Sequence, residues 1–97
     1  MIKTPALSEE QVAAFERDGF VHVPGAFDAK DVETILSWTS EVMAMPEEPG
    51  RQWVYHEKSR KDGADLVNRI EKIAPYHEGY RRLTDVLGDV ASSALRE

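Results

Sequence analysis

The alternation of apolar and polar positions in the first part of the chain predicts a short helix followed by a strand. Ser8 and Gln11 have the spacing of a capping box, which marks a helix start. Asp18-Gly19 is a typical helix end, because glycine adopts the left-handed C-cap conformation without a Cβ clash. Residues 20–23, FVHV, are β-branched and aromatic and are followed by a Pro-Gly turn signal. We therefore expect a strand over residues 20–23.

A longer helix is predicted over about residues 29 to 45. Asp28 can cap its start, and Pro46 ends it because proline cannot continue a helix. Several side chains recur at a spacing of 3.6 on one face, which we expect to be buried. These residues are Val32, Ile35, Leu36, Thr39, Val42 and Met43.

The second half of the chain predicts two strands and a last helix. Residues 52–57 and 66–73 are rich in β-formers, and Asp62-Gly63 between them is a turn signal, so a hairpin with a long polar loop is expected. Alternation places Val67, Arg69, Glu71 and Ile73 on one face of the second strand. Pro75 can open the helix, and Gly88 is expected to interrupt it, with Asp89 capping a short terminal turn. The expected buried stripe is Tyr80, Leu83, Val86 and Leu87.

Together these elements define an α+β fold in the order helix-strand-helix-strand-strand-helix. At 97 residues the chain is a single domain or a segment of a larger one. It divides into an acidic helix-strand-helix part, residues 1–50, and a strand pair with a helix, residues 51–97. Isolated strand pairs are marginal in water, so three short strands need a larger sheet to join.

The distribution of charge argues against nucleic acid as a partner. Residues 1–50 carry three basic and ten acidic side chains, a net −7, whereas residues 51–97 carry nine basic and eight acidic ones, a net +1. The first half therefore repels phosphate backbones. The cations of the second half form either a solvated face or a local anion site: Arg51, Lys58, Arg60, Lys61 and Arg69.

The composition also bears on cellular location. No apolar run reaches the ~18 residues that a membrane span needs, and the first residues lack the apolar core of a signal peptide. The chain has no cysteine, which excludes disulfides and thiolate metal sites. We expect a cytoplasmic protein with no membrane partner.

Metal chemistry can be checked completely, because the chain has only three histidines. A facial-triad iron site usually begins with His-x-Asp or His-x-Glu, and His22, His56 and His77 have neither. The H-E-x-x-H zinc motif and glycine-rich phosphate loops are absent as well. The sequence therefore predicts no catalytic residue and no metal ligand, and His22 and His77 are interpreted as structural.

Two local groups of residues remain as candidates for substrate binding. The first is Trp53 and Tyr55, with His56 next to them in the sequence. Trp53 and Tyr55 share one strand face and either form the floor of a ligand pocket or pack in the core. Arg69 and Glu71 are two residues apart and so lie on the same sheet face. They form either a polar site for an anionic substrate or a mutual ion pair on an edge strand.

The chain resembles the N-terminal part of the phytanoyl-CoA dioxygenase family, which are non-haem iron(II), 2-oxoglutarate-dependent oxygenases. The resemblance lies in residues 7–11 (LSEEQ), 15–21 (FERDGFV) and 23–27 (VPGAF), and further in WVYHE at 53–57 and RIEK at 69–72. Residues 83–88 are similar to the helix that precedes the first core strand. The resemblance implies the front of a double-stranded β-helix (jelly-roll) oxygenase.

This resemblance implies a function only for a longer protein. The family's His-x-Asp, its distal His and its 2-oxoglutarate-binding residue would lie beyond position 97, so the 97-residue chain is expected to lack the iron-binding barrel and to be inactive alone. The full-length enzyme would use Fe(II) and 2-oxoglutarate to hydroxylate a small anionic substrate. Its expected substrate-side residues are Trp53, Tyr55, His56, Arg69 and Glu71.

A second hypothesis needs no longer protein. The chain is then a self-contained acidic α+β module that binds a partner protein and has no enzymatic activity. Under the first hypothesis, an unfinished core also allows the chain to associate with itself.

Overall fold

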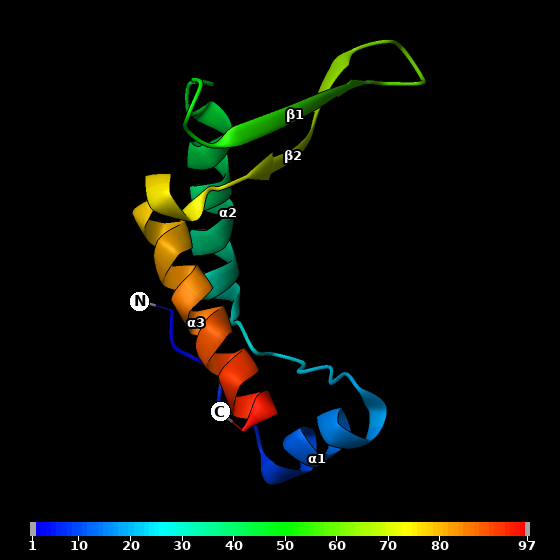
Figure 1. Cartoon of the computed structure of the whole chain (residues 1–97), viewed down its shortest axis with the longest axis vertical. Helices are drawn as coiled ribbons and strands as arrows, with labels where there is room; N and C mark the ends of the chain where they lie inside the picture. The colour runs from blue at the N-terminus through cyan, green and yellow to red at the C-terminus, as the bar shows by residue number, and fades with distance from the viewer. Residues whose placement is uncertain (1, 97) are drawn as a thin grey trace.

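A computed structural model describes residues 2–96 and contains three α-helices, one short 3₁₀ helix and one two-stranded sheet (Figure 1). This confirms the α+β class. The elements along the chain are α1 (Glu9–Asp18), α2 (Ala29–Ala44), β1 (Trp53–Lys58), β2 (Asp65–Glu71), η1 (Ala74–Tyr76) and α3 (Glu78–Leu95).

Both ends of α1 form as its sequence predicts. The Ser8 hydroxyl accepts a hydrogen bond from the Gln11 N–H at 3.1 Å, and the Ser8 N–H donates to the Gln11 side chain at 2.9 Å. At the other end, Gly19 has a φ of 82° and its N–H donates to the Phe15 carbonyl. The capping box and the glycine C-cap are therefore confirmed, and they satisfy backbone groups that the helix ends leave free.

The strand expected over residues 20–23 does not form. Among residues 2–96 the only paired strands are β1 and β2, and residues 20–28 connect α1 to α2 without regular structure. Phe20 is 68% exposed. A strand needs a neighbouring strand to satisfy its backbone groups, and no described segment pairs with this one. The β-rich composition of these four residues is therefore insufficient by itself.

The helices α2 and α3 pack against each other over their facing sides. Gly79 lies against the indole ring of Trp38, so closely that a Cβ at position 79 would collide with the ring. The Tyr80 hydroxyl and the Thr39 hydroxyl are 2.6 Å apart, and the Thr39 hydroxyl also donates to the Ile35 carbonyl. These contacts join two segments that are about forty residues apart in sequence.

His77 caps the start of α3. Its Nδ1 accepts the Tyr80 N–H at 3.1 Å, and its Nε2 lies 2.6 Å from the Glu41 carboxylate of α2. The structural interpretation of His77 is thus confirmed. The helix then runs without a break through Gly88 to Leu95, so the predicted interruption at Gly88 and the cap at Asp89 are wrong. A single glycine costs a helix only about 1 kcal/mol, which the contacts on either side of it offset.

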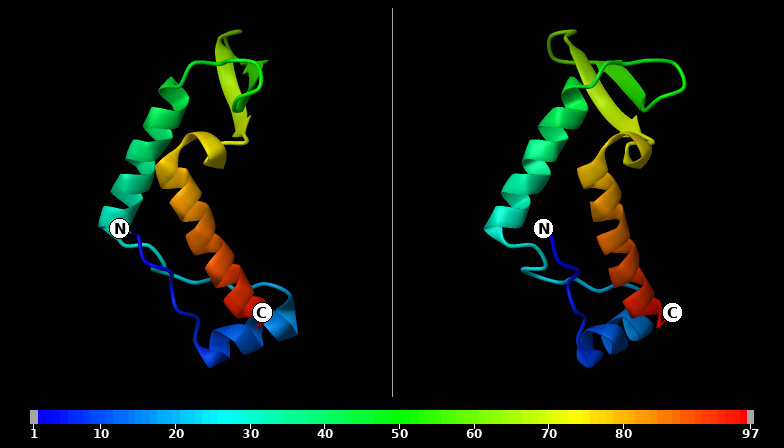
Figure 2. Two further views of the ribbon diagram at one scale, coloured as in Figure 1. Left: turned by 60° about the vertical axis from the view of Figure 1, so that its left-hand side comes forward. Right: turned by 90° about the vertical axis from the view of Figure 1, so that its left-hand side faces the viewer.

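The hairpin lies beyond one end of the α2–α3 pair, and α1 lies at the other end (Figure 2). β1 pairs with β2 antiparallel, and neither strand packs on a helix within the described residues. β2 ends at Glu71, because Lys72 takes a left-handed φ of 61° and turns the chain into η1. The strand prediction to residue 73 is therefore two residues too long.

The described residues bury few apolar side chains. The buried ones are Ile2, Val12, Val42, Leu83 and Ala94. On the face of α2 that was predicted to be buried, Val32, Leu36 and Met43 are exposed. On the predicted buried face of α3, Leu87 is exposed. The accessible surface is 7331 Å², against about 5,600 Å² for a compact monomer of this mass. The radius of gyration is 16.8 Å, against about 12.5 Å for a compact domain of this length. The fold is open, and α2 uses only part of its apolar surface.

Candidate functional site

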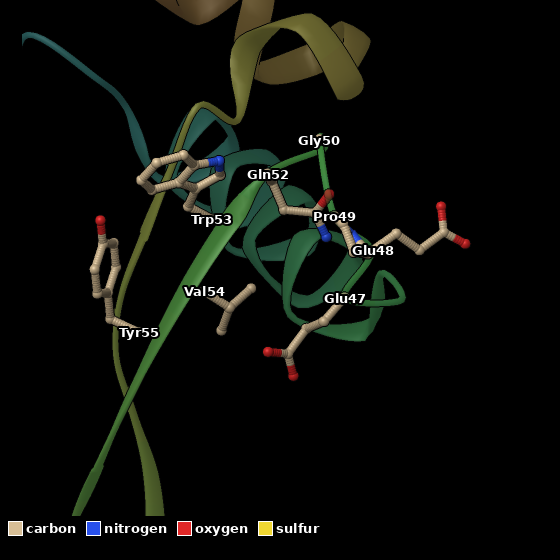
Figure 3. A pocket seen from close by; sticks show the side chains of 8 residues that line it. All are labelled: Glu47, Glu48, Pro49, Gly50, Gln52, Trp53, Val54 and Tyr55. Carbon is tan, nitrogen blue, oxygen red and sulfur yellow. The ribbon is translucent and has the colours of Figure 1, made fainter.

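The hairpin brings Trp53 and Tyr55 together on one face of β1. Their ring centroids lie 6.5 Å apart with the planes tilted by 52°. Both side chains leave the strand on the side opposite to Val54 (Figure 3). This confirms the shared face, which follows from strand alternation. Trp53 is 56% exposed, so it does not pack in a core formed by the described residues.

Arg69 and Glu71 of β2 join this pair of rings. The pairing of the strands sets Trp53 opposite Glu71 and Tyr55 opposite Arg69. The Arg69 guanidinium stacks 4.3 Å from the centre of the Tyr55 ring, and its Nε lies 3.0 Å from the Glu71 carboxylate. The Tyr55 hydroxyl lies 3.5 Å from the other carboxylate oxygen. Four of the five predicted substrate residues thus form one group, here called the hairpin cluster: Trp53, Tyr55, Arg69 and Glu71.

The ion pair in the hairpin cluster is open to solvent. The side chains of Arg69 and Glu71 are 61% and 46% exposed, and both strands of the sheet are edges. Arg69 and Glu71 therefore form an ion pair on an edge strand of this chain. Such exposed pairs contribute about 0.2–1 kcal/mol to stability, so this one is a minor element of the fold.

His56, the fifth predicted residue, is not brought into the hairpin cluster. It alternates with Tyr55 along β1, so its side chain leaves the opposite face. Its Nε2 lies 2.8 Å from Glu47 and its Nδ1 lies 2.8 Å from Asp65. Both ring nitrogens of His56 face carboxylates. The hydrogen bond to Glu47 is the main cause that raises the pKa of His56, and the hydrogen bond to Asp65 raises it further.

The Lys58 ammonium group also lies 3.4 Å from the Asp65 carboxylate. Partial burial opposes ionisation of Asp65, but the hydrogen bonds from Lys58 and His56 outweigh it and lower the pKa of this carboxyl. His56 therefore ties the turn after α2 to the start of β2. Sequence reasoning missed Glu47 and Asp65, because each lies nine residues from His56 and carries no local motif.

A pocket of about 480 Å³ lies beside the hairpin cluster, between the turn after α2 and β1 (Figure 3). Gln52 is 3% exposed, and its Nε2 donates to the Pro46 carbonyl at 2.9 Å, which fixes the orientation of its amide. Among the described residues its Oε1 has no hydrogen-bond partner. Trp53 and Tyr55, which the sequence indicates as a candidate pocket floor, line this pocket, whereas the part taken by Gln52 and the turn after α2 was not predicted. Its lining residues are Glu47, Glu48, Pro49, Gly50, Gln52, Trp53, Val54 and Tyr55.

The described residues do not fit an iron site. Within residues 2–96 no three His, Asp or Glu side chains are placed to hold a metal ion. Both ring nitrogens of His56 and of His77 are already hydrogen-bonded inside the protein, and His22 lies alone in the exposed connection between α1 and α2. No step of iron chemistry can therefore be assigned to these residues.

The chain is similar to the 2-aminoethylphosphonate dioxygenase of Uncultured bacterium HF130_AEPn_1. The two are 32% identical over 74 residues, which are 76% of this chain and 28% of the relative. The chain thus matches less than a third of the length of this curated relative. No protein-family profile and no solved structure matches the chain. A dioxygenase is therefore a distant relative of this chain. This match supports the resemblance to a dioxygenase and does not single out a family.

A helix that crosses a bilayer needs about 20 predominantly apolar residues. Within residues 2–96, no helix combines the length and the apolar character needed to cross a bilayer.

Proposed function

We propose that the chain is the N-terminal segment of a non-haem Fe(II)/2-oxoglutarate-dependent dioxygenase of the phytanoyl-CoA dioxygenase family. The observation that carries this proposal is the 74-residue match to a dioxygenase. The matched residues make up 28% of that dioxygenase. In the intact enzyme the iron ligands and the 2-oxoglutarate site come from the rest of the protein, and the 97 residues are inactive alone.

The open fold supports this proposal. A soluble monomer rarely leaves many large apolar side chains exposed unless a further surface covers them. Here one face of α2 exposes Val32, Leu36 and Met43, and the hairpin exposes Leu66 and Val67. A barrel with more strands would cover these faces and extend the two-stranded sheet, which is marginal alone.

The proposed substrate is a small anionic molecule that the hairpin cluster helps to bind. The relative is named for a small phosphonate. Arg69 provides a fixed guanidinium on a solvent-exposed face, and guanidinium groups bind carboxylates and phosphonates through paired N–H donors. In this proposal the segment contributes substrate contacts, while the rest of the enzyme contributes the oxidant.

The purified chain tests the division of labour. After incubation with Fe(II) and desalting, we expect less than stoichiometric iron, and we expect no consumption of 2-oxoglutarate above the level of free Fe(II). Stoichiometric retention of ferrous ion together with turnover of 2-oxoglutarate would reject the proposal, because the catalytic site would then lie within these 97 residues.

A second function, an acidic α+β module that binds a partner protein, is favoured by the charge division between residues 1–50 and 51–97. Such a module has a complete core and unfolds in one cooperative transition. A broad transition with strong binding of the dye ANS indicates exposed apolar surface and would reject the module. The same measurement at several protein concentrations detects self-association through the exposed apolar faces.

A further inference from the structure

We propose that His56 is a proton-operated latch that holds the hairpin against the turn after α2. With a proton on each ring nitrogen, His56 bonds Glu47 of this turn and fixes the orientation of the hairpin. When the ring loses one proton, the hairpin is free to turn about its base, where β1 starts and β2 ends. The latch concerns the placing of the hairpin and not a reaction, so it goes beyond the proposed function and does not depend on it.

The latch is the contact that joins the paired strands to the rest of the chain. The hairpin projects from the helices, and no helix packs on β1 or β2 within the described residues. Among residues 2–96, one hydrogen bond links these strands to a part of the chain outside the hairpin, and it runs over 2.8 Å from His56 Nε2 to Glu47. The orientation of the hairpin therefore depends on this bond.

The remaining contacts lie at the base of the hairpin and leave it free to turn. The Gln52 amide donates to the Pro46 carbonyl at 2.9 Å, just before β1. The Tyr76 hydroxyl donates to the Gly50 carbonyl at 2.9 Å, from η1 beyond the end of β2. Both bonds lie outside the strands, so they stay intact when the hairpin turns. Short segments at the ends of elements are where hinges usually lie.

A count of protons shows why the latch needs a charged ring. His56 Nε2 lies 2.8 Å from Glu47, and Nδ1 lies 2.8 Å from Asp65. An ionised carboxylate only accepts hydrogen bonds, and a neutral imidazole has a single N–H to donate. Both contacts are hydrogen bonds only when both ring nitrogens are protonated. The arrangement of the three side chains is therefore that of an imidazolium between two carboxylates.

Loss of one proton releases Glu47 and not Asp65. Asp65 is held beside His56 by the strand pairing, and it also has Lys58 as a partner at 3.4 Å. In the described part of the chain, the Glu47 side chain has no other hydrogen bond or ion pair. A neutral ring that keeps its N–H on Asp65 turns a lone pair toward Glu47, and the repulsion is relieved when the hairpin moves away.

The charged groups around His56 set the direction of the pH response. They are Glu47 from the turn and Asp65 from β2, with Lys58 of β1 beside Asp65. The hydrogen bond to Glu47 is the main cause that raises the pKa of His56 above 6.5. The latch is therefore closed below that value and opens as the pH rises through the raised pKa.

His77 has a carboxylate partner as well, but its contacts need only one proton. Its Nε2 lies 2.6 Å from Glu41, and its Nδ1 accepts the Tyr80 N–H at 3.1 Å. A neutral ring with the proton on Nε2 satisfies both contacts. The requirement for a second proton thus distinguishes His56 from His77.

Residual dipolar couplings between ¹³Cα and ¹Hα, measured by NMR on the 97-residue chain in a weakly aligning medium, test the latch. At about pH 6 the couplings of the hairpin and of the α2–α3 pair should fit one common alignment. At about pH 9 the hairpin couplings should still fit the geometry of the paired strands but should shrink relative to those of the helices. A common alignment at both pH values would overturn the proposal. Separation of β1 from β2 at the higher pH would overturn it too, because the hairpin would then not move as a unit.

Matched variants of the turn separate the latch from other effects of pH. Glu47→Ala removes the partner of His56, so the hairpin should move independently at both pH values. Glu47→Gln should keep one common alignment at both, because an amide accepts from the charged ring and donates to the neutral one. Glu48→Gln, at the neighbouring position, is the control and should respond to pH as the unaltered chain does. A pH response that persists in either Glu47 variant would assign the movement to another group and overturn the latch.

Discussion

The α2–α3 pair and the β-hairpin are held together by different forces. The helix pair depends on close packing, with Trp38 against Gly79 and the Thr39–Tyr80 hydrogen bond between distant segments. The hairpin projects from the helices and carries exposed charged contacts, such as the Arg69–Glu71 pair. Packing is insensitive to pH and salt, whereas exposed ion pairs are weak and easily exchanged.

The comparison assigns a different role to each region. The helix pair is a scaffold, since its contacts cannot be exchanged without separating the helices. The hairpin is suited to binding, because the partners of Arg69 and Glu71 can be replaced by those of a ligand at little cost to the fold. Candidate binding residues lie on an element that the scaffold positions at one end.

The largest effect is expected from Gly79→Ala. The new methyl group would collide with the Trp38 ring, and overpacking of this kind costs about 1–3 kcal/mol of unfolding free energy. Gly88→Ala in the same helix is the control, because no heavy atom lies within 4 Å of its Cβ position. That change should stabilise the helix by about 0.5–1 kcal/mol. Helix melting followed by circular dichroism measures both, and equal stability of the two variants would show that the helices do not pack as described.

Removal of Arg69 should affect binding and spare the fold. In a full-length dioxygenase that contains this segment, Arg69→Ala is expected to raise KM for the substrate on the order of tenfold, because the proposed function makes the guanidinium the partner of the substrate's anionic group. The melting temperature should change little, since the residue is exposed. Arg60→Ala serves as the control. Unchanged steady-state kinetics would remove Arg69 from the site.

A smaller effect on the scaffold is expected from Tyr80→Phe. The change deletes the hydroxyl that bonds Thr39 and keeps the ring, so about 0.5–1.5 kcal/mol of unfolding free energy should be lost. Tyr76→Phe deletes the bond from η1 to the Gly50 carbonyl, which lies in the turn before the hairpin. It should loosen the hairpin and leave helix melting unchanged. Chemical denaturation followed by helix and aromatic signals distinguishes the two, and similar losses of helix stability would contradict the division into two regions.

The smallest expected effect is the pH dependence of the hairpin. The folded-state pKa of His56 is raised above its ordinary value of 6.5, so its contribution is complete below that value and is lost as the pH rises through the raised pKa. The pKa of Asp65 is lowered from 3.8, so its contribution is lost only as the pH falls below that value.

The two shifts together predict a stable window between these limits. Hydrogen exchange in β1 and β2, corrected for the intrinsic pH dependence of exchange, should be slower at about pH 6 than at about pH 9. His56→Gln should abolish the pH effect on the hairpin, and a persistent effect in this variant would assign it to another group.

Local rules in the sequence were sufficient for the helix starts and for two pairs of neighbours on a strand face. The longer face predicted for Val67, Arg69, Glu71 and Ile73 is wrong, because a register shift between Tyr55 and His56 sets Val67 opposite His56 and β2 ends at Glu71. The Ser8–Gln11 capping box and the Gly19 cap depend on residues close in sequence, and they form as predicted. The same holds for Trp53 beside Tyr55 and for Arg69 beside Glu71, since alternation along one strand places them.

Features that depend on distant partners were not predictable. Residues 20–23 have strand composition but no neighbouring strand among the described residues, and Gly88 stays helical within a long α3. The contacts of His56 with Glu47 and Asp65 arise from the hairpin turn and the end of α2, which no single segment encodes. The cross-strand register that unites the hairpin cluster also has no signature in either strand alone.

The central claim is that these 97 residues are the front segment of a dioxygenase, and the reading frame after codon 97 in the native gene tests it most directly. We expect the frame to continue and to encode a His-x-Asp within a few tens of residues, followed by a distal histidine. A stop codon immediately after codon 97, with no separate gene for the remaining segment, would contradict the claim.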